Sequence, residues 1–472
     1  MKRRVVSVLM AAAISMGLCA CGSSGGDSTG SNASETSQSQ ESTASTGEVV
    51  EVDFWSAPNV DQYNFWTKKA NEFNEAGIEL DGKKIEVKVQ QMPESPSSEA
   101  GIQNAIATGT IPAASENVNM GFSATLAESE AVYDIQDEDW YKEIVKNRAM
   151  ETAVEGWALD GKQYVIPEYI NPMSLQWNVR ALEIMGIDVP KTMDDFKGMI
   201  EAFVEHRDEL SAAGISHTFY RPALLRSDQW WERWYDFQQF YQSLNGGGKW
   251  VDGDQLTFTQ EGMETTLEMI GLLGNTIMVD EIEPLWSADE VAVVFSISAP
   301  WEIESLTEAG KVYGEDYVYG PCIVENESDT AYSFGDSKGL VFYKNKSISE
   351  EEHNGAIAFV SWVYSAENSA QSDLEFFEAL NMMPVRGDID TNEVFAEKMA
   401  GTPAYVDLAT YIPNTIPAMA HAKMTEIQEA FTEAAMVPYI SEVITCEPLN
   451  APDAKEYVED AVQAMKDAGG LN

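Results

Sequence analysis

The sequence predicts an α/β fold built around a largely parallel sheet, and the alternation of strands and helices near its beginning carries that prediction. Residues 48–55 and 84–90 alternate apolar and polar side chains, which is typical of strands. Residues 59–77 and 97–109 have helical spacing, and each helix is expected to end at its final glycine. Strands and helices that alternate at this spacing indicate an α/β unit.

The rest of the chain continues this alternation with variations. The apolar run at 355–364 predicts a helix, and the chain from Ala404 onward predicts almost only helices. Glycines at 246–248 and the Asp-Gly-Asp at 252–254 predict an exposed turn rather than a calcium site, because further oxygen donors are missing. The other predicted elements are strands at 164–167, 290–295 and 339–343 and a helix that begins at Met193.

The first residues have the pattern of an exported protein. Three cations at residues 2–4 precede an apolar stretch, Val5–Leu18, which is too short to span a bilayer comfortably as a finished helix. Leu18-Cys19-Ala20-Cys21-Gly22 resembles the lipobox of bacterial lipoproteins, with cleavage before Cys21 and lipidation of its thiol. The sequence therefore predicts a lipoprotein signal peptide at residues 1–20. An ordinary secretory signal with a chance cysteine is the alternative.

Residues 21–47 are expected to be a lipidated cysteine followed by a disordered linker. The segment is rich in Ser, Thr and Gly and has no aromatic residue, so it cannot bury enough apolar surface to offset the entropy of ordering. No later stretch has the roughly 20 apolar residues of a spanning helix. We therefore expect attachment by lipid alone, at the extracellular face of the bacterial cytoplasmic membrane.

Composition restricts the partners and the chemistry of the folded part. The chain has 472 residues, and residues 48–472 are long enough for two domains. The net charge of −49 disfavours nucleic acid and anionic lipid headgroups and suits a solvated extracellular surface. Cys322 and Cys446 either pair or stay free thiols. No CxxC or HExxH pattern is present, so no metal and no cofactor are expected.

Six segments, in order, resemble the family 1 extracellular solute-binding proteins of ABC importers, which include maltose-binding-protein-like chains. The most specific segment is Asp160-Gly-Lys-Gln-Tyr-Val-Ile-Pro167, continued by Ser174-Leu-Gln-Trp-Asn178 and by Gly186–Phe196. Ala113 departs from the family pattern, which has an aspartate there, so no ligand contact is carried over to that loop. The other matching segments are Val52–Trp55, Gln103–Pro112, Ser298–Trp301, Phe359–Asn368 and Met383–Arg386.

The resemblance implies a two-lobed, periplasmic-binding-protein-like fold of type II, with hinge crossings and a ligand cleft that closes between the lobes. By position, the first lobe would be residues 48–167, with 318–360 returning to it. The second lobe would be residues 171–317, with 361–472 returning mainly to it.

The resemblance also implies which residues hold the ligand. Trp301 stands where the family's tryptophan stacks on a sugar ring. Asn171 lies in the first crossing, where relatives place a polar or acidic ligand contact. Aromatic faces and planar polar groups are what sugar recognition needs. The remaining candidates lie where strands are expected to reach the cleft or in an aromatic-rich segment, and they are Trp55, Asn59, Tyr220, Arg221, Trp230, Trp231 and Asp336.

Several of these residues also have a structural interpretation. Trp55 could fill the core beneath the first strand, and Arg221 could form a surface ion pair. On one helix at most two of Trp230, Trp231 and Trp234 share a face, so at least one of them is expected in the core. Trp177 is expected to pack rather than to contact ligand.

The function implied is that of a monomer that captures a sugar or oligosaccharide and delivers it to ABC permease subunits in the membrane. A non-sugar solute, such as a polyamine, an iron chelate or a peptide, is the alternative within the same fold. An anchored glycoside hydrolase is a further alternative. It would need two facing carboxylates, and no local motif for these or for another catalytic site is present.

Overall fold

The computed structural model describes residues 48–472 except Pro96, Asp160, residues 226–229, Lys249, Glu281, residues 283–284 and Ala420. Within its helices and strands, the side chains of residues 152, 223, 225, 230–232 and 336 are also outside the description. The predicted signal peptide, Cys21 and the linker lie outside the described residues. The chain from Gly47 to Asn472 forms one compact unit.

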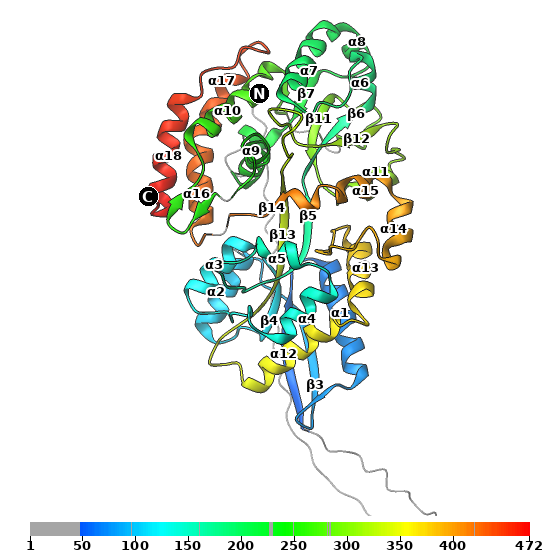
Figure 1. Ribbon diagram of the computed structural model, residues 1–472, viewed down its shortest axis with the longest axis vertical. Helices are drawn as coiled ribbons and strands as arrows, with labels where there is room; N and C mark the ends of the chain where they lie inside the picture. The colour runs from blue at the N-terminus through cyan, green and yellow to red at the C-terminus, as the bar shows by residue number, and fades with distance from the viewer. Residues whose placement is uncertain are drawn as a thin grey trace, which may run out of the picture. The chain divides into compact units, whose positions relative to one another are not determined.

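Two mixed sheets organise the described chain (Figure 1). In the described residues the first sheet has the strand order β14-β13-β4-β1-β3-β2, and β5 pairs with β13. We call this sheet and the helices packed on it the first lobe. Its strands are β1 (Val49–Ser56), β2 (Glu79–Leu80), β3 (Lys83–Gln91), β4 (Ala114–Val118), β5 (Ile166–Pro172), β13 (Ser333–Phe342) and β14 (Thr415–Ile416).

Both faces of the first sheet are covered, and the alternation along β1 shows how. Val52 and Phe54 point to the face covered by α1, α4, α12 and α13, whereas Trp55 packs on the opposite face, which α2 and α3 cover. The strand alternation predicted for residues 48–55 is confirmed. The helices of this lobe are α1 (Val60–Ala76), α2 (Ser98–Thr108), α3 (Met120–Glu128), α4 (Asp139–Asn147), α5 (Glu151–Glu155), α12 (Glu350–Val363) and α13 (Ser369–Leu380).

The second sheet has the order β10-β7-β11-β6-β12 in the described residues. We call this sheet and its helices the second lobe. A separate two-stranded hairpin, β8 (Val251–Asp252) with β9 (Gln255–Leu256), holds the Asp-Gly-Asp turn, as predicted. The strands of the sheet are β6 (Ser174–Asn178), β7 (His217–Tyr220), β10 (Ile277–Met278), β11 (Val293–Ser298) and β12 (Tyr317–Gly320).

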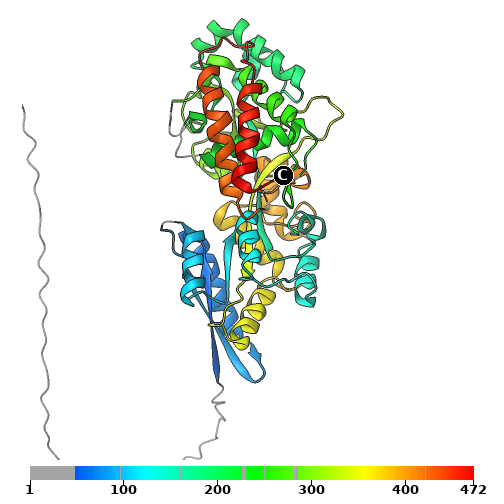
Figure 2. The same ribbon diagram turned by 90° about the vertical axis from the view of Figure 1, so that its left-hand side faces the viewer.

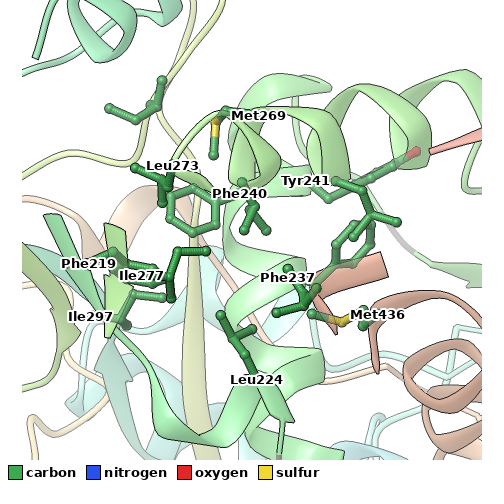
Figure 3. Packing of buried hydrophobic residues seen from close by; sticks show 14 of the residues in the cluster. Phe219, Leu224, Phe237, Phe240, Tyr241, Met269, Leu273, Ile277, Ile297 and Met436 are labelled. Carbon is green, nitrogen blue, oxygen red and sulfur yellow. The ribbon is translucent and has the colours of Figure 1, made fainter. Parts of the chain in front are cut away.

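One large apolar cluster fills the second lobe, and Figure 3 shows part of it around α9. Trp177 stacks on Phe295 with ring centroids 4.7 Å apart, and Trp234 is fully buried, so both packing predictions are confirmed. Figure 2 shows the C-terminal helices α16 and α18 side by side. The helices around this core are α6 (Val179–Met185), α7 (Met193–Glu205), α8 (Arg207–Ala212), α9 (Trp230–Leu244), α10 (Gln260–Gly271), α16 (Met424–Phe431), α17 (Val437–Val443) and α18 (Lys455–Gly469).

A smaller apolar cluster packs on the other face of the second sheet. Tyr317 and Tyr319 of β12 contribute to it, together with Phe377 of α13. Its remaining helices are α11 (Glu302–Glu308), α14 (Ala396–Gly401) and α15 (Pro403–Ala409). Because α13 also contacts α1 in the first lobe, this cluster joins the two lobes.

The pairing of the strands shows where the chain passes between the two sheets. Only Met173 separates β5 in the first sheet from β6 in the second. Tyr317–Gly320 still pairs with β6, so the return to the first sheet begins at β13 rather than at residue 318. Helix α13 packs against α1, and β14 (Thr415–Ile416) still pairs with β13, so the last passage to the second lobe follows Ile416 and not residue 360.

The strand predicted at 164–167 begins at Ile166 and continues to Pro172. Proline normally interrupts pairing within a sheet, and for that reason the sequence pattern predicts an end at Pro167. Pro167 pairs with Gly339 beside a register shift in which Glu168 is the extra residue of β5. Prolines are tolerated at such irregularities.

Candidate functional site

Strands of both sheets end at the same place beside the crossing at Met173. In the first lobe β5 runs toward the start of β13, with Asn171 opposite Asp336 and Ile166 opposite Leu340. Strand β4 is antiparallel to β13 and parallel to β1, so the carboxyl ends of β1, β4 and β5 share this edge.

In the second lobe the register leads to the same edge. Ser174 at the start of β6 pairs with Ser298 at the end of β11. Strands β7 and β10 follow the direction of β11, and β12 is antiparallel to β6. The carboxyl ends of β7, β10, β11 and β12 therefore lie beside the crossing. Carboxyl ends of strands are where open α/β sheets bind ligands.

Trp301 follows β11 at this edge and is 40% exposed. Ser298, at the end of β11, donates a hydrogen bond from Oγ to Oε2 of Glu302 at 2.7 Å. This bond ties the turn that carries Trp301 to the first residue of α11. A large aromatic side chain exposed at a strand end can present its face to a bound solute.

Trp55 and Asn59 lie at the end of β1. Trp55 is half-buried and packs against the cluster under α2 and α3. Asn59 is exposed, and its Oδ1 accepts hydrogen bonds from the backbone N–H groups of Asp61 at 2.9 Å and Gln62 at 3.1 Å. The side-chain oxygen of Asn59 therefore caps α1, and its amide nitrogen is the part that remains for a ligand.

Asn171 is fully buried near the end of β5, two residues before the crossing at Met173. Its Oδ1 accepts a hydrogen bond from the backbone N–H of Met383 at 3.1 Å. Its Nδ2 has no hydrogen-bond partner among the described residues. A buried amide nitrogen without a partner is costly, so Asn171 offers a donor where the lobes meet.

Tyr220 and Arg221 end β7 on the second-lobe side. The hydroxyl of Tyr220 donates to the carbonyl oxygen of Ile282 at 3.1 Å. Nη2 of Arg221 lies 2.9 Å from Oδ1 of Asp236 on α9, and the Asp236 side chain is only 3% exposed. This ion pair fixes the end of β7 against α9. An ion pair was the structural alternative for Arg221, and its partner Asp236 is buried.

Three predicted contacts fall on side chains outside the described part of the structure. Trp230 and Trp231 are the first two residues of α9, and Asp336 lies on β13 opposite Asn171. The backbone of Asp336 lies at the edge defined above. The prediction that these three residues contact ligand stays a prediction.

Two cavities between the lobes involve residues that the sequence did not indicate. One, of about 240 Å³, is lined by Met120 of the first lobe and by Trp250 and the segment 415–419. The other, of about 340 Å³, has Glu128 and Lys162 on one side and the β8–β9 turn on the other. None of the predicted contacts is among the described residues that line them. The only sequence signal for Trp250 as a cavity residue is its position directly after the glycine-rich segment 246–248.

The remaining expectations concern metals, membranes and thiols. The described residues contain no group of three or more His, Cys, Asp or Glu side chains able to hold a metal ion. Within the same residues, no helix has the length and apolar character needed to cross a membrane. Cys322 and Cys446 are free thiols in this structure, and Cys322 is buried.

The fold and the shared strand edge define a class of protein: a two-lobed binder whose solute site lies between hinged lobes. The chain belongs to the bacterial extracellular solute-binding proteins, because the model of that family matches residues 68–403. The predicted fold is confirmed at this level, and so is the extracellular setting. Members of this family bind their substrate and are not enzymes, which excludes the glycoside hydrolase alternative.

Solved structures with the same fold come from several bacteria. An uncharacterized protein of Listeria monocytogenes EGD-e is 27% identical with a TM-score of 0.75, over 89% of this chain and 98% of that one. The cyclic alpha-maltosyl-1,6-maltose binding protein of Arthrobacter globiformis is 13% identical, with a TM-score of 0.68 and coverage of 89% and 98%. The sugar-binding protein MalE of Xanthomonas citri is 13% identical, with a TM-score of 0.69 and the same coverage. No curated protein matches the chain.

Proposed function

We propose that this protein captures a sugar or oligosaccharide between its lobes and delivers it to the permease of an ABC importer. The observation that carries the proposal is Trp301, an exposed aromatic side chain at the edge where the strands of both sheets end. Sugar-binding proteins share the fold, and one from Listeria monocytogenes is described in complex with cycloalternan. A solute that touches both lobes favours the closed form through contacts that the open form lacks.

We further propose that Cys21 is lipidated and that the linker after it keeps a monomeric binding protein near its permease. Replacement of Cys21 by alanine should release the protein into the medium, whereas the parent chain should remain with the membrane fraction and incorporate a labelled fatty acid. Equal release of both chains would contradict the anchor.

The test of the solute class is a binding screen. Tryptophan fluorescence and thermal unfolding of the purified mature protein would be followed against maltotriose, cycloalternan, spermidine and a ferric chelate. We expect an oligosaccharide to raise the unfolding temperature. A response to spermidine or to the chelate alone would replace the sugar by one of the alternative solutes.

The same screen tests the role of Trp301. Its replacement by alanine should weaken binding of the responding sugar by about 1–3 kcal/mol, the value of one stacked ring. Val204→Ala is the matched control, because Val204 is an exposed apolar residue on α7, away from the strand edge. If both variants bound like the parent, Trp301 would not belong to the site.

A further inference from the structure

Helix α3 of the first lobe lies directly against a segment of the second lobe. This segment is residues 417–424 apart from Ala420, and we call it the strap. The strap follows β14 and ends with the first residue of α16. Met419 is 3% exposed and belongs to the large apolar cluster of the second lobe, and Met424 packs against the same cluster. The strap is therefore anchored in the second lobe, although it begins directly after a strand of the first sheet.

The two faces of α3 have different neighbours. Phe122 and Leu126 belong to the apolar cluster of the first lobe that α2 and α3 cover. Residues spaced i, i+3, i+4 and i+7 share one face of a helix. On the face turned to the second lobe, the residues with this spacing are Gly121, Ala124, Thr125 and Glu128.

The closest approach between α3 and the strap is at Gly121. A Cβ at this position would lie 2.5 Å from Sδ of Met424 and 3.0 Å from the backbone oxygen of Met419. A relaxed contact between carbon atoms needs about 3.5–4.0 Å, so a side chain at residue 121 would have to push Met424 or the strap away. Glycine within a helix is otherwise unfavourable relative to alanine. At Gly121 the missing side chain is what lets the two lobes touch.

One turn further along α3, Thr125 bonds to the strap. Its Oγ1 donates a hydrogen bond to the backbone oxygen of Ala422 at 3.1 Å. Ala124 and Glu128 line the cavity of about 340 Å³ together with His421 and the β8–β9 turn. Because protein supplies both sides of this contact, the contact does not require a solute.

The contact lies beside the proposed solute site. Strand β4 ends at Val118, and α3 begins two residues later at Met120. Oδ1 of Asn119 accepts the backbone N–H of Phe122 at 2.8 Å, which caps α3 and fixes its start near the strand edge. Because α3 belongs to one lobe and the strap is anchored in the other, an opening motion of the lobes separates them.

We propose that the face of α3 formed by Gly121 and Thr125 is a latch that holds the strap and sets how much of the solute-free protein is closed. The apparent affinity for a solute is reduced by the fraction of protein in the binding-competent form, so the latch also sets affinity. Gly121, Thr125 and Met424 are thus positioning residues that need not touch the solute.

The inference rests on the proposed function only for its effect on affinity. Two of its tests use the full chain without any solute. If no solute bound the parent chain, the proposed function would fail and these two tests would still decide whether the latch exists.

The first test is small-angle X-ray scattering of the solute-free protein. Gly121→Leu places a side chain where Met424 lies, and it should give a larger radius of gyration than the parent. Gly198→Leu is the matched control, because a Cβ at Gly198 in α7 meets no atom within 4 Å, and it should scatter as the parent does. A radius of gyration of Gly121→Leu equal to that of the parent would overturn the latch.

The second test removes the hydrogen bond without adding volume, and it decides the question even if Gly121→Leu fails to fold. In Thr125→Val, amide hydrogen exchange at Met424, whose N–H bonds to the backbone oxygen of His421 at 3.0 Å, should become about two- to tenfold faster, the range of one hydrogen bond. Exchange at Val87 in the first lobe, whose N–H bonds to Asn74, should stay as in the parent. Unchanged exchange at Met424 would show that Thr125 does not hold the strap.

The third test measures affinity for a solute that binds the parent chain. Gly121→Leu should bind this solute about tenfold more weakly, the effect of losing one hydrogen bond and one packed contact. Gly198→Leu should bind it as the parent does. If Gly121→Leu were expanded without solute but kept the affinity of the parent, the latch would not control the site.

Discussion

Asp373 is the side chain on which the buried charges of the first lobe depend most. Its Oδ2 lies 2.9 Å from Nε of Arg148 and 3.0 Å from Nη1 of Arg386, and its Oδ1 lies 2.9 Å from Nη2 of Arg148. All three side chains are at most 3% exposed. Asp373→Asn keeps the volume but removes the negative charge that both guanidinium groups face.

The expected cost follows from what remains around the arginines. Arg148 would keep the backbone oxygens of Pro167 and Glu168 and a weak contact with Sδ of Met150. Arg386 would keep Asp388 and the backbone oxygen of Asn147. Removing one partner of a buried ion pair typically costs about 3–5 kcal/mol. With about 2 kcal/mol per molar urea for a lobe of this size, the midpoint of first-lobe unfolding should fall by roughly 1.5–2.5 M.

The assay is urea unfolding at pH 7 followed by circular dichroism, with hydrogen exchange in β1 to identify the first-lobe transition. Asp390→Asn is the matched control, because Asp390 is exposed, and it should shift the midpoint by only a few tenths of a molar. If Asp373→Asn shifted the midpoint no more than Asp390→Asn, solvent would be satisfying the arginines and the buried-network argument would be refuted.

Two further predictions concern α1 and β13. Asn59→Ala removes the cap of α1 and should lower the free energy of unfolding by about 1 kcal/mol in thermal unfolding. Asn59→Asp should keep the cap. If both variants lost affinity for the solute, the amide nitrogen of Asn59 would be assigned as a solute contact. Gly339→Ala places a Cβ against the backbone oxygen of Ile166, and should cost about 1–3 kcal/mol in urea unfolding. The control is Gly198→Ala in α7, where the added Cβ has no atom within 4 Å and should stabilise the protein by about 0.5–1 kcal/mol. If the two variants had the same stability, β13 would have to shift to accept the Cβ at residue 339.

Local periodicity explains why the fold was predictable from the sequence. The first strand and helix were found because β1 alternates and because Asn59 and Gly77 bound α1. The boundaries between the lobes were harder to predict, because strand pairing sets them. Residues 317–320 and 333–342 are both strands, but only their partners show that the first stays in the second sheet. Pairing between distant segments has no period in the sequence.

The candidate site was predictable only where a short motif marks it. Trp301 could be named from the residues around Pro300. The buried glutamates Glu116 of β4 and Glu168 of β5 could not be named, since each looks like an ordinary solvated acid in so acidic a chain. Met120 and Trp250 line the same cavity although they belong to different lobes, so their proximity depends on how the lobes pack. Contacts of this kind depend on the three-dimensional arrangement and not on spacing.

The placement of the candidates determines what kind of solute could close the lobes. Trp301 and Arg221 follow strands β11 and β7 of the second sheet, Asn59 follows β1 of the first sheet, and Asn171 lies near the end of β5. A solute that touched only the first-lobe edge would bind the open and closed forms equally, so it would not shift the equilibrium between them. A solute that contacted both the amide of Asn171 and the ring of Trp301 would bind the closed form more tightly than the open form. The geometry therefore favours ligands that span both edges, which is the reason an oligosaccharide fits the proposal better than a small ion.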